Sequence, residues 1–246
     1  FVESRVPLSS ASRQPLMIPP LLLSGPPGVG KTQFAMDLAE ALGAPIRIQS
    51  MENAQAPALW LGTERHWATA SHGIVLDQIV FGAVANPLFL IDEIDKAPKG
   101  MRYDPLMALH SLLEPVTART VRDAGLDITF DAGLAIYIAT SNDRSAVPES
   151  LLTRFREFVI LPPRGDDALR SAYAVAVSAA NKLGVAGFSP PDRRFAHMLA
   201  HLSAREIYQA VQDAAARAVQ NGRMHLTISE LPAGIVDDDQ YGGRPV

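Results

Sequence analysis

Residues 21–32 read LLLSGPPGVGKT, a short apolar run that passes into a glycine-rich turn and then into a lysine and a threonine. The turn fits the pattern G-x-x-x-x-G-K-[ST] between Gly25 and Thr32. Glycines let the backbone bend until successive N–H groups point at phosphate oxygens, and the following helix adds the positive end of its dipole. The stretch therefore predicts a buried strand, a phosphate-binding loop and a helix, whereas an incidental glycine-rich turn would need neither flanking element.

The side chains of this loop have separate expected roles in binding ATP. Lys31 is expected to reach the β- and γ-phosphates, and the Thr32 hydroxyl is expected to bind Mg²⁺. The backbone of the loop supplies the other contacts to phosphate. The expected nucleotide-binding residues are Gly25, Pro26, Pro27, Gly28, Val29, Gly30, Lys31 and Thr32.

A second apolar stretch, residues 88–91, ends in the acids Asp92 and Glu93. Acids often end strands, but the phosphate-binding loop upstream gives this pair a specific interpretation. Asp92 is expected to hold the Mg²⁺ that bridges the phosphates, and Glu93 is expected to polarise the attacking water as general base. A protein that only binds nucleotide has little need of the second acid, so Glu93 favours hydrolysis.

Polar residues also follow the strand expected at 134–139. Asn142, with Thr140 as the alternative, is placed to hydrogen-bond the γ-phosphate or the attacking water. An asparagine alone would be read as a turn residue, and only the neighbouring motifs favour the catalytic interpretation.

Apolar runs alternate with helical periodicity over the first two thirds of the chain. Strands are expected at 21–23, 46–48, 87–91, 134–139 and 158–161, and helices at 34–42 and 106–113. This alternation predicts an α/β fold with a mostly parallel sheet.

The pattern changes at Pro162 and Pro163 and becomes helical and rich in alanine. Ser203 followed by Glu206 is the signature of a capping box at the start of the last helix. Helices are expected at about 165–183, 191–201 and 204–221. The expected domains are an N-terminal arm or linker at 1–19, a nucleotide-binding core at 20–162, and a helical lid domain with a C-terminal tail at 163–246.

The composition of the 246-residue chain narrows its class. It contains no cysteine, which excludes disulfides, zinc–thiolate sites and thiol catalysis. The net charge of -4 gives no basic footprint for nucleic acid, without excluding a local patch. No apolar run reaches the roughly 18 residues of a membrane span, and no signal peptide is visible. Because the first residue is Phe1 and not Met, we expect the natural N-terminus upstream, and we expect a cytoplasmic location.

With these motifs the chain resembles AAA+ ATPases, and among them it is most similar to the ATPase module of the Lon protease family. The stretch 90–96 resembles that family's Walker B segment, 139–142 matches its sensor 1, and 147–154 matches the stretch that carries its arginine finger. The segments 101–105 and 112–115 follow at the family's spacing. The resemblance implies a P-loop NTPase fold of three layers (α/β/α) with a five-stranded parallel sheet, a helical lid, and assembly into a ring, usually a hexamer.

The resemblance also implies roles for several arginines. Arg154 matches the arginine finger, which acts on the ATP of a neighbouring subunit, and Arg156 is the reserve candidate. Arg205, in the first turn after the Ser203 cap, matches sensor 2 and would reach the γ-phosphate from the lid. The alternatives are a surface ion pair for Arg154 and an ordinary exposed arginine for Arg205.

A loop that grips polypeptide in the pore of the ring is expected between the second strand and Asp92. Alignment of Gly62 and Gly73 with the family places Trp67 and Ala68 at its aromatic–hydrophobic pair. A large flat side chain at this position can hold polypeptide without reading its sequence. Trp60 is a competing candidate, and a core tryptophan is the alternative for either. Arg119 and Arg122 are candidates for a second pore loop.

The Lon family places a protease domain with a Ser–Lys dyad after the lid, and here no lysine follows Lys182. We therefore expect no protease activity from this chain by itself. The leading hypothesis is a ring-forming, Mg²⁺-dependent ATPase that binds ATP and ADP and unfolds or remodels a protein substrate, as a chaperone does. The alternative is an ATP-controlled assembly switch that recruits a partner, protein or DNA. A third possibility, a degenerate ATPase that only binds nucleotide, is opposed by Glu93 and Arg154.

Overall fold

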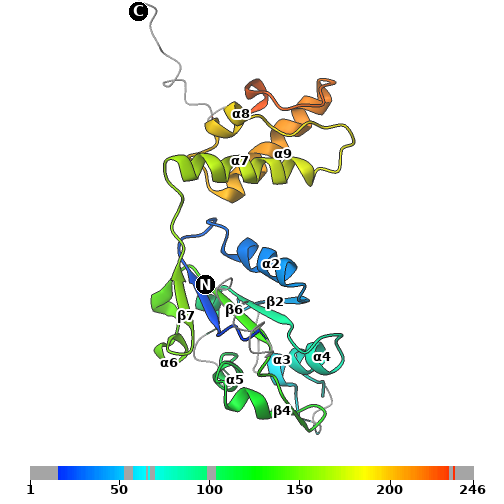
Figure 1. Cartoon of the computed structure of the whole chain (residues 1–246), viewed down its shortest axis with the longest axis vertical. Coiled ribbons are helices and arrows are strands. Elements are labelled where there is room, and N and C mark those ends of the chain that lie inside the picture. Colours follow the sequence, from blue (N-terminus) through cyan, green and yellow to red (C-terminus); the bar gives the residue numbers. More distant parts are fainter. Residues whose placement is uncertain are drawn as a thin grey trace, which may run out of the picture. The chain divides into compact units, whose positions relative to one another are not determined.

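The computed structural model describes residues 16–52, 58–64, 66, 70–98, 104–232 and 235. The chain divides between Ile160 and Leu161 into two compact units (Figure 1). Two of the expected pore-loop residues, Trp67 and Ala68, lie outside the described residues.

The first unit is built on a parallel sheet of five strands in the order β2-β3-β6-β1-β7. The strands are β1 (Leu21–Ser24), β2 (Ile46–Ser50), β3 (Leu88–Asp92), β6 (Ile136–Ser141) and β7 (Arg156–Val159). Each coincides with a predicted strand, and β6 and β7 are each shifted by two residues from the predicted bounds. The predicted α/β fold with a parallel sheet is confirmed.

Alternate residues of the central strands face opposite sides of the sheet, as the period of a strand requires. Leu21 and Leu23 of β1 pack into one core cluster, whereas Leu22 packs into the other. Helix α2 (Lys31–Leu42) covers the first side. The second side is covered by α3 (Ala58–Leu61), α4 (Ile74–Val80), α5 (Met107–Leu112) and α6 (Glu149–Leu152). Helices therefore lie on both faces, which gives the expected three layers (Figure 1).

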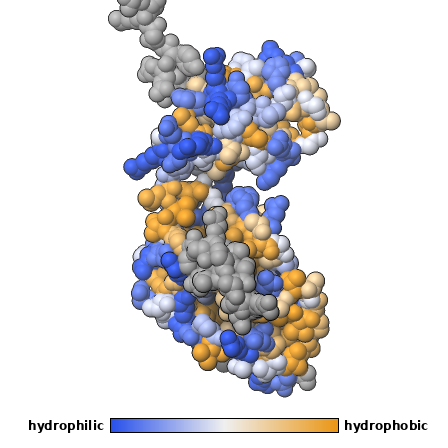
Figure 2. All heavy atoms as spheres, in the orientation of Figure 1, coloured by the Kyte–Doolittle hydropathy of each residue, from blue (hydrophilic) through white to orange (hydrophobic). Residues whose placement is uncertain are grey.

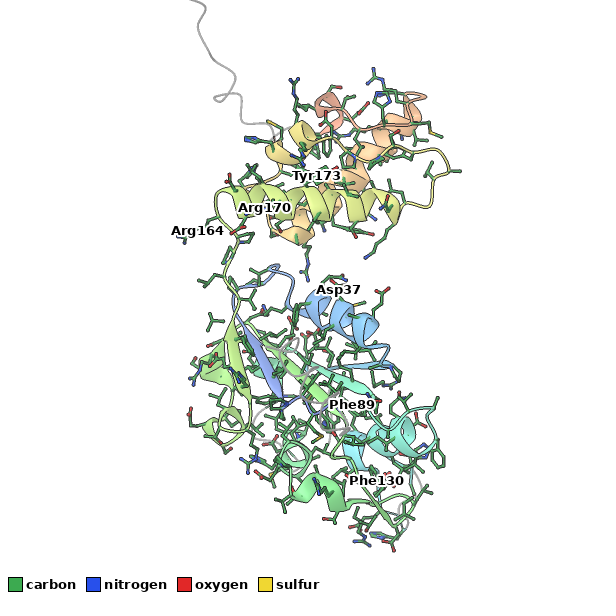
Figure 3. The ribbon with its side chains drawn as sticks, viewed as in Figure 1. Asp37, Phe89, Phe130, Arg164, Arg170 and Tyr173 are labelled. Carbon is green, nitrogen blue, oxygen red and sulfur yellow. The ribbon has the colours of Figure 1, made fainter. Side chains whose placement is uncertain are left out.

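Trp60 is completely buried in the second cluster, against Phe89 of β3. Phe89 is labelled in Figure 3. The two rings meet edge to face with centroids 6.3 Å apart. A tryptophan in this position has no face for substrate, so the interpretation of Trp60 as a pore residue is wrong, and it is a core residue.

A two-stranded antiparallel hairpin precedes β6, formed by β4 (Val121–Asp123) and β5 (Ile128–Phe130). The sequence did not predict it, because each strand has only three residues, too few to give a clear period of alternation. Phe130, labelled in Figure 3, packs against the core cluster on the second side of the sheet. This contact fixes the hairpin to the unit. Short 3-10 turns complete the unit: η1 (Ile94–Lys96), η2 (Thr117–Thr120) and η3 (Arg144–Ala146).

The second unit is helical. It contains α7 (Asp166–Asn181), α8 (Arg193–Met198), α9 (Ala204–Gln220) and a 3-10 turn, η4 (Ile228–Glu230). Its core is made largely of alanines from α7 and α9 around Phe195, so the helices approach closely. The visible surface of this unit is mostly hydrophilic (Figure 2). The predicted capping box is present, since Glu206 accepts the Ser203 N–H at 2.7 Å and the Ser203 hydroxyl accepts the Glu206 N–H at 3.4 Å.

Over the part of the chain that the structure describes, every helix is too short or too polar to cross a membrane.

Candidate functional site

The loops that follow β1, β3 and β6 meet at one edge of the sheet, because these strands are neighbours and all run the same way. Crevices at the carboxyl ends of parallel strands are where such folds bind ligands. This placement brings together five of the predicted site residues: Lys31, Thr32, Asp92, Glu93 and Asn142.

The phosphate-binding loop joins β1 to α2 and requires its glycines. A Cβ atom on Gly25 would lie 2.1 Å from the Ile160 carbonyl oxygen, so no side chain fits there. Gly28 and Gly30 have φ angles of 79° and 93°, which L-residues with side chains adopt rarely. Gly30 stands directly before α2, whose N-terminal N–H groups are available to an anion.

Lys31 is the first residue of α2 and is only 7% exposed. Its ammonium donates hydrogen bonds to the carbonyl oxygens of Gly25 at 2.8 Å and Pro26 at 2.9 Å, and to Oδ1 of Asn142 at 2.8 Å. Burial lowers the Lys31 pKa, and the negative charges of Asp95, Asp92 and Glu93 oppose this fall. The site therefore holds a buried cation that three carboxylates help to keep protonated.

Asp92, at the end of β3, receives two hydroxyl groups on one oxygen. Thr32 Oγ1 donates to Asp92 Oδ1 at 2.9 Å, and Thr140 Oγ1 donates to the same atom at 2.6 Å. A carboxylate and a hydroxyl oxygen in contact are the hard oxygen ligands that Mg²⁺ prefers. The Thr32 and Asp92 side chains thus have the chemistry that their predicted role as Mg²⁺ ligands requires.

Glu93 follows β3 in a left-handed conformation, with φ and ψ both 54°. Non-glycine residues seldom adopt it, and they do so most often at functional sites. Its N–H donates to Thr140 Oγ1 at 2.9 Å, and its Oε1 accepts Nδ2 of Asn142 at 3.2 Å. Asn142 thereby contacts both Lys31 and Glu93, whereas Thr140 contacts Asp92 and the backbone of Glu93. Of the two residues left open by the sequence, Asn142 lies beside both the cation and the acid.

Asp95 is a residue of this site that the sequence interpretation missed. Its side chain is 1% exposed, and its Oδ1 accepts the backbone N–H of Asn142 at 3.1 Å. Its Oδ2 lies 4.0 Å from the Lys96 ammonium and makes no hydrogen bond within the described residues. Asp95 belongs to the stretch 90–96 that carries the resemblance. Only the 3-10 turn η1 shows that its carboxylate points inward and not to solvent.

Arg154 lies apart from these groups, directly after α6. Its Nη1 donates to the carbonyl oxygen of Ser150, and its Nε is buried without a hydrogen-bond partner among the described residues. Burial lowers the pKa of His110, and the positive charge of Arg154 lowers it further. Arg156 lies on β7, with its guanidinium 5.7 Å from the Phe158 ring centroid.

The remaining candidates lie on other elements. Arg205 is exposed in the first turn of α9, in the second unit. Arg119 is exposed on η2. Arg122 is exposed on β4 and pairs with Asp127, with 2.5 Å between Nη2 and Oδ1.

Comparisons with known proteins find one matching family and several similar proteins. Residues 21–163 match the family described as "ATPase family associated with various cellular activities (AAA)". The chain is 37% identical over 137 residues to a Lon protease of Metamycoplasma arthritidis, covering 56% of this chain and 16% of that protein. It is 33% identical over 162 residues to Lon protease 2 of Herpetosiphon aurantiacus, covering 66% of this chain and 19% of that protein. The chain thus spans less than a fifth of the length of these relatives.

Solved structures of similar fold include a mutant of Thermotoga maritima RuvB, with a TM-score of 0.62 at 14% identity. That match covers 93% of this chain and 65% of the other. A structure described as the RuvB Holliday junction branch migration motor of the same organism matches with a TM-score of 0.59 at 15% identity, covering 93% of this chain and 64% of that one. At this identity the likeness shows the fold alone.

Proposed function

Because the chain belongs to the AAA family of ATPases, we propose that it binds ATP with Mg²⁺ and hydrolyses it within a ring of identical chains. One observation carries the proposal: the side chain of Asn142 joins the buried Lys31 ammonium to the Glu93 carboxylate. A binding-only site would need the lysine, but it would not need an acid held beside it.

In the proposed complex the loop from Gly25 to Thr32 surrounds the phosphates. Lys31 exchanges its bonds to loop carbonyls for bonds to the β- and γ-phosphate oxygens, which are stronger because both partners are charged. Thr32 and Asp92 would hold the Mg²⁺, which neutralises charge that builds on the phosphates. Arg205 of the lid is proposed to contact the γ-phosphate.

Hydrolysis begins when a water oxygen attacks the γ-phosphorus. Glu93 takes the proton of that water, the bond from the γ-phosphorus to the bridging oxygen breaks, and ADP leaves with the bonding electrons. Asn142 holds the water and the γ-phosphate in line, since its amide both donates and accepts. Thr140 keeps the two acids in place, because its hydroxyl donates to the Asp92 carboxylate and accepts the backbone N–H of Glu93.

Arg154 is proposed to complete the site of the neighbouring chain as an arginine finger. Among the described residues its guanidinium donates to the Ser150 carbonyl oxygen of α6, so other N–H groups remain for a phosphate. Such a finger contributes roughly 10³- to 10⁵-fold to the rate in related reactions.

We propose that the work of this ring is to unfold or remodel a protein. The support is the similarity to the ATPase part of Lon proteases and the expected placement of Trp67 and Ala68 at the pore. Arg122, the exposed residue of β4, is proposed to act in the same pore.

A mixing experiment tests the shared site. ATPase rate per chain is measured against protein concentration for the wild type, Glu93→Gln and Arg154→Ala, with Arg156→Ala as the matched control. We expect the wild-type rate to rise with concentration, both mutants to lose it, and the Arg156→Ala rate to stay. An equimolar mixture of the two inactive mutants should regain activity, because a chain with intact Glu93 then borrows Arg154 from its neighbour.

A rate that is flat with concentration and survives Arg154→Ala would exclude the shared site. The chain would then be better described as an ATP-controlled switch that recruits a partner.

A further inference from the structure

A second buried acid, Asp123, lies at the end of β4. It is away from the edge of the sheet that carries Lys31, Asp92, Glu93 and Asn142, which we call the nucleotide edge. The exposure of Asp123 is 0%, and its carboxylate binds two backbone N–H groups. Oδ2 accepts from Gly73 at 2.7 Å, and Oδ1 accepts from Leu126 at 2.9 Å. A carboxylate in such a position is held by charge-assisted bonds, which are strong and directional.

The two donors belong to different segments of the chain. Gly73 closes the segment that begins at Gly62 and stands directly before α4. Leu126 lies in the turn between β4 and β5. One side chain therefore ties the base of the Gly62–Gly73 loop to the turn of the hairpin.

The backbones of these segments also touch directly, and three glycines allow it. A Cβ on Gly73 would lie 2.2 Å from the Trp60 carbonyl oxygen, and a Cβ on Gly125 would lie 2.3 Å from the Ser71 carbonyl oxygen. A Cβ on Gly62 would lie 2.9 Å from the Gly125 nitrogen. The contact is therefore closer than any side chain would permit.

Further backbone bonds close the same contact. The Ala124 N–H donates to the Leu61 carbonyl oxygen at 2.7 Å, which joins the hairpin turn to α3. The two ends of the loop are joined by the Thr63 N–H, which donates to the Ser71 carbonyl oxygen at 2.9 Å. The Ser71 N–H donates in return to Thr63 Oγ1 at 2.9 Å.

We propose that Asp123 is a positioning residue that makes the base of the Gly62–Gly73 loop and the β4–β5 turn move as one unit. We call this contact, formed by Gly62, Gly73, Asp123, Gly125 and Leu126, the Asp123 junction. The mechanical consequence rests on the proposed function, in which the loop carries Trp67 and the hairpin carries Arg122. A displacement of polypeptide by one segment is then transmitted to the other.

Asp123→Asn tests the junction with the smallest change in shape. The amide has one acceptor oxygen, and its NH₂ group faces an N–H donor, so one of the two bonds must be lost. If the segments move as one, the loss of either bond loosens both. If they are independent, only the segment that lost its bond loosens.

Hydrogen exchange on the full chain distinguishes these cases. For Asp123→Asn we expect the amides of residues 70–80 and of residues 121–130 both to exchange about tenfold faster or more, while α2 and the central strands keep their rates. Asp131→Asn is the matched control. Within the described part of the chain Asp131 accepts the Gly133 N–H of its own turn, at 2.7 Å, and no other hydrogen bond, and an amide oxygen can still accept it. Thr63→Val, which removes the side-chain bonds from Thr63 to Ser71, should speed exchange in residues 62–73 and leave the hairpin unchanged.

Faster exchange confined to one segment in Asp123→Asn would overturn the proposal. Faster exchange across the whole first unit would also overturn it, since Asp123 would then be a general stabilising residue.

A parallel assay separates this result from the proposed function. With casein as an unfolded protein probe, the ratio of stimulated to basal ATPase should fall in Asp123→Asn and in Trp67→Ala. If Trp67→Ala leaves the ratio unchanged, the pore-loop assignment fails, while the exchange result still decides the junction.

Discussion

The nucleotide edge and the Asp123 junction are two solutions to the same problem, the placing of loops from distant parts of the chain. At the nucleotide edge, side chains contact one another: Lys31 reaches Asn142, and Asn142 reaches Glu93. At the junction, one side chain holds backbone N–H groups, and glycines bring the backbones together.

The difference explains why the two regions depend on sequence in different ways. Reactive side chains must be specific residues at specific offsets from a strand end, which gives the nucleotide edge its motifs. A backbone contact needs only small residues and one acceptor, so it leaves almost no pattern. Substitutions at the nucleotide edge should therefore change activity, and substitutions at the junction should change the motion of loops.

Lys31→Ala should show the largest effect in this comparison. Bonds between a charged lysine and phosphate contribute about 1.5–3 kcal/mol each, so we expect ATP affinity to fall by about 10- to 100-fold or more. Titration calorimetry with ATP and Mg²⁺ measures this. Lys96→Ala is the control, because the Lys96 side chain is half exposed and bonds no group of the phosphate loop. Equal affinities in the two variants would contradict the placement of the site.

Asp95→Asn tests the acid that the sequence interpretation missed. The variant keeps an acceptor for the Asn142 N–H but loses the charge that most strongly opposes the fall of the Lys31 pKa. We expect kcat to fall about tenfold with little change in the KM for ATP, since the acid acts through Asn142 and Lys31 and does not bind nucleotide.

The pH dependence of the same variant gives an independent readout. Without the Asp95 charge the Lys31 pKa is lowered further, so activity should begin to fall at a lower alkaline pH than in the wild type. Lys96→Ala, which removes only the partner at 4.0 Å, should keep the wild-type profile. A proportional loss of kcat and stability, with the pH profile unchanged, would assign Asp95 a purely structural role.

Most of the fold followed from local pattern. The inner strands β1, β3 and β6 were predicted because a strand buried on both faces gives a continuous apolar run. The edge strands β2 and β7 are partly exposed and gave shorter apolar signals. The helix expected at 34–42 is present as α2, which Gly43 ends in the left-handed conformation, with φ 61°. The hairpin, α3 and α4 were missed because their residues are positioned by contacts with distant segments, such as Ala124 with Leu61.

The same division holds for the site. Lys31, Asp92, Glu93 and Asn142 could be placed together because parallel neighbouring strands end at one edge. Asp95 could not, since its inward orientation depends on the left-handed backbone at Glu93 and the 3-10 turn that follows. Trp60 was a candidate for the pore, although a tryptophan in a short apolar helix packs equally well in a core. Its contact with Phe89 shows that it is a core residue.

Glu157 supports the nucleotide edge from β7, and its effect should appear as pH-dependent stability. It accepts Ser24 Oγ at 2.6 Å and Arg144 Nε at 2.9 Å, and the hydrogen bond from Ser24 is the largest cause of its lowered pKa. A carboxylate with a lowered pKa stabilises the fold above the ordinary value near 4.5, and this stabilisation is lost as pH falls from there.

Glu157→Gln should therefore cost about 1 kcal/mol of unfolding free energy at pH 7 and progressively less below about pH 4.5. Urea unfolding at several pH values measures the difference. Glu149→Gln on α6 is the control. A cost that does not shrink with acidification would show that the charge of Glu157 is not what matters.

Asp127→Asn should have the smallest effect on stability and on hydrogen exchange. It gives the closest contrast with Asp123→Asn, because both substitutions lie in one hairpin and exchange an oxygen for an NH₂ group. Asp127 is 48% exposed and pairs with Arg122, which is 69% exposed, so the ion pair is screened by solvent. Its φ of 59° is left-handed, and asparagine adopts that conformation readily. We expect the unfolding free energy to change by less than about 0.5 kcal/mol, with exchange of residues 70–80 unchanged. If Asp127→Asn instead loosened the Gly62–Gly73 loop as much as Asp123→Asn does, the whole hairpin, and not the buried carboxylate, would hold the loop in place.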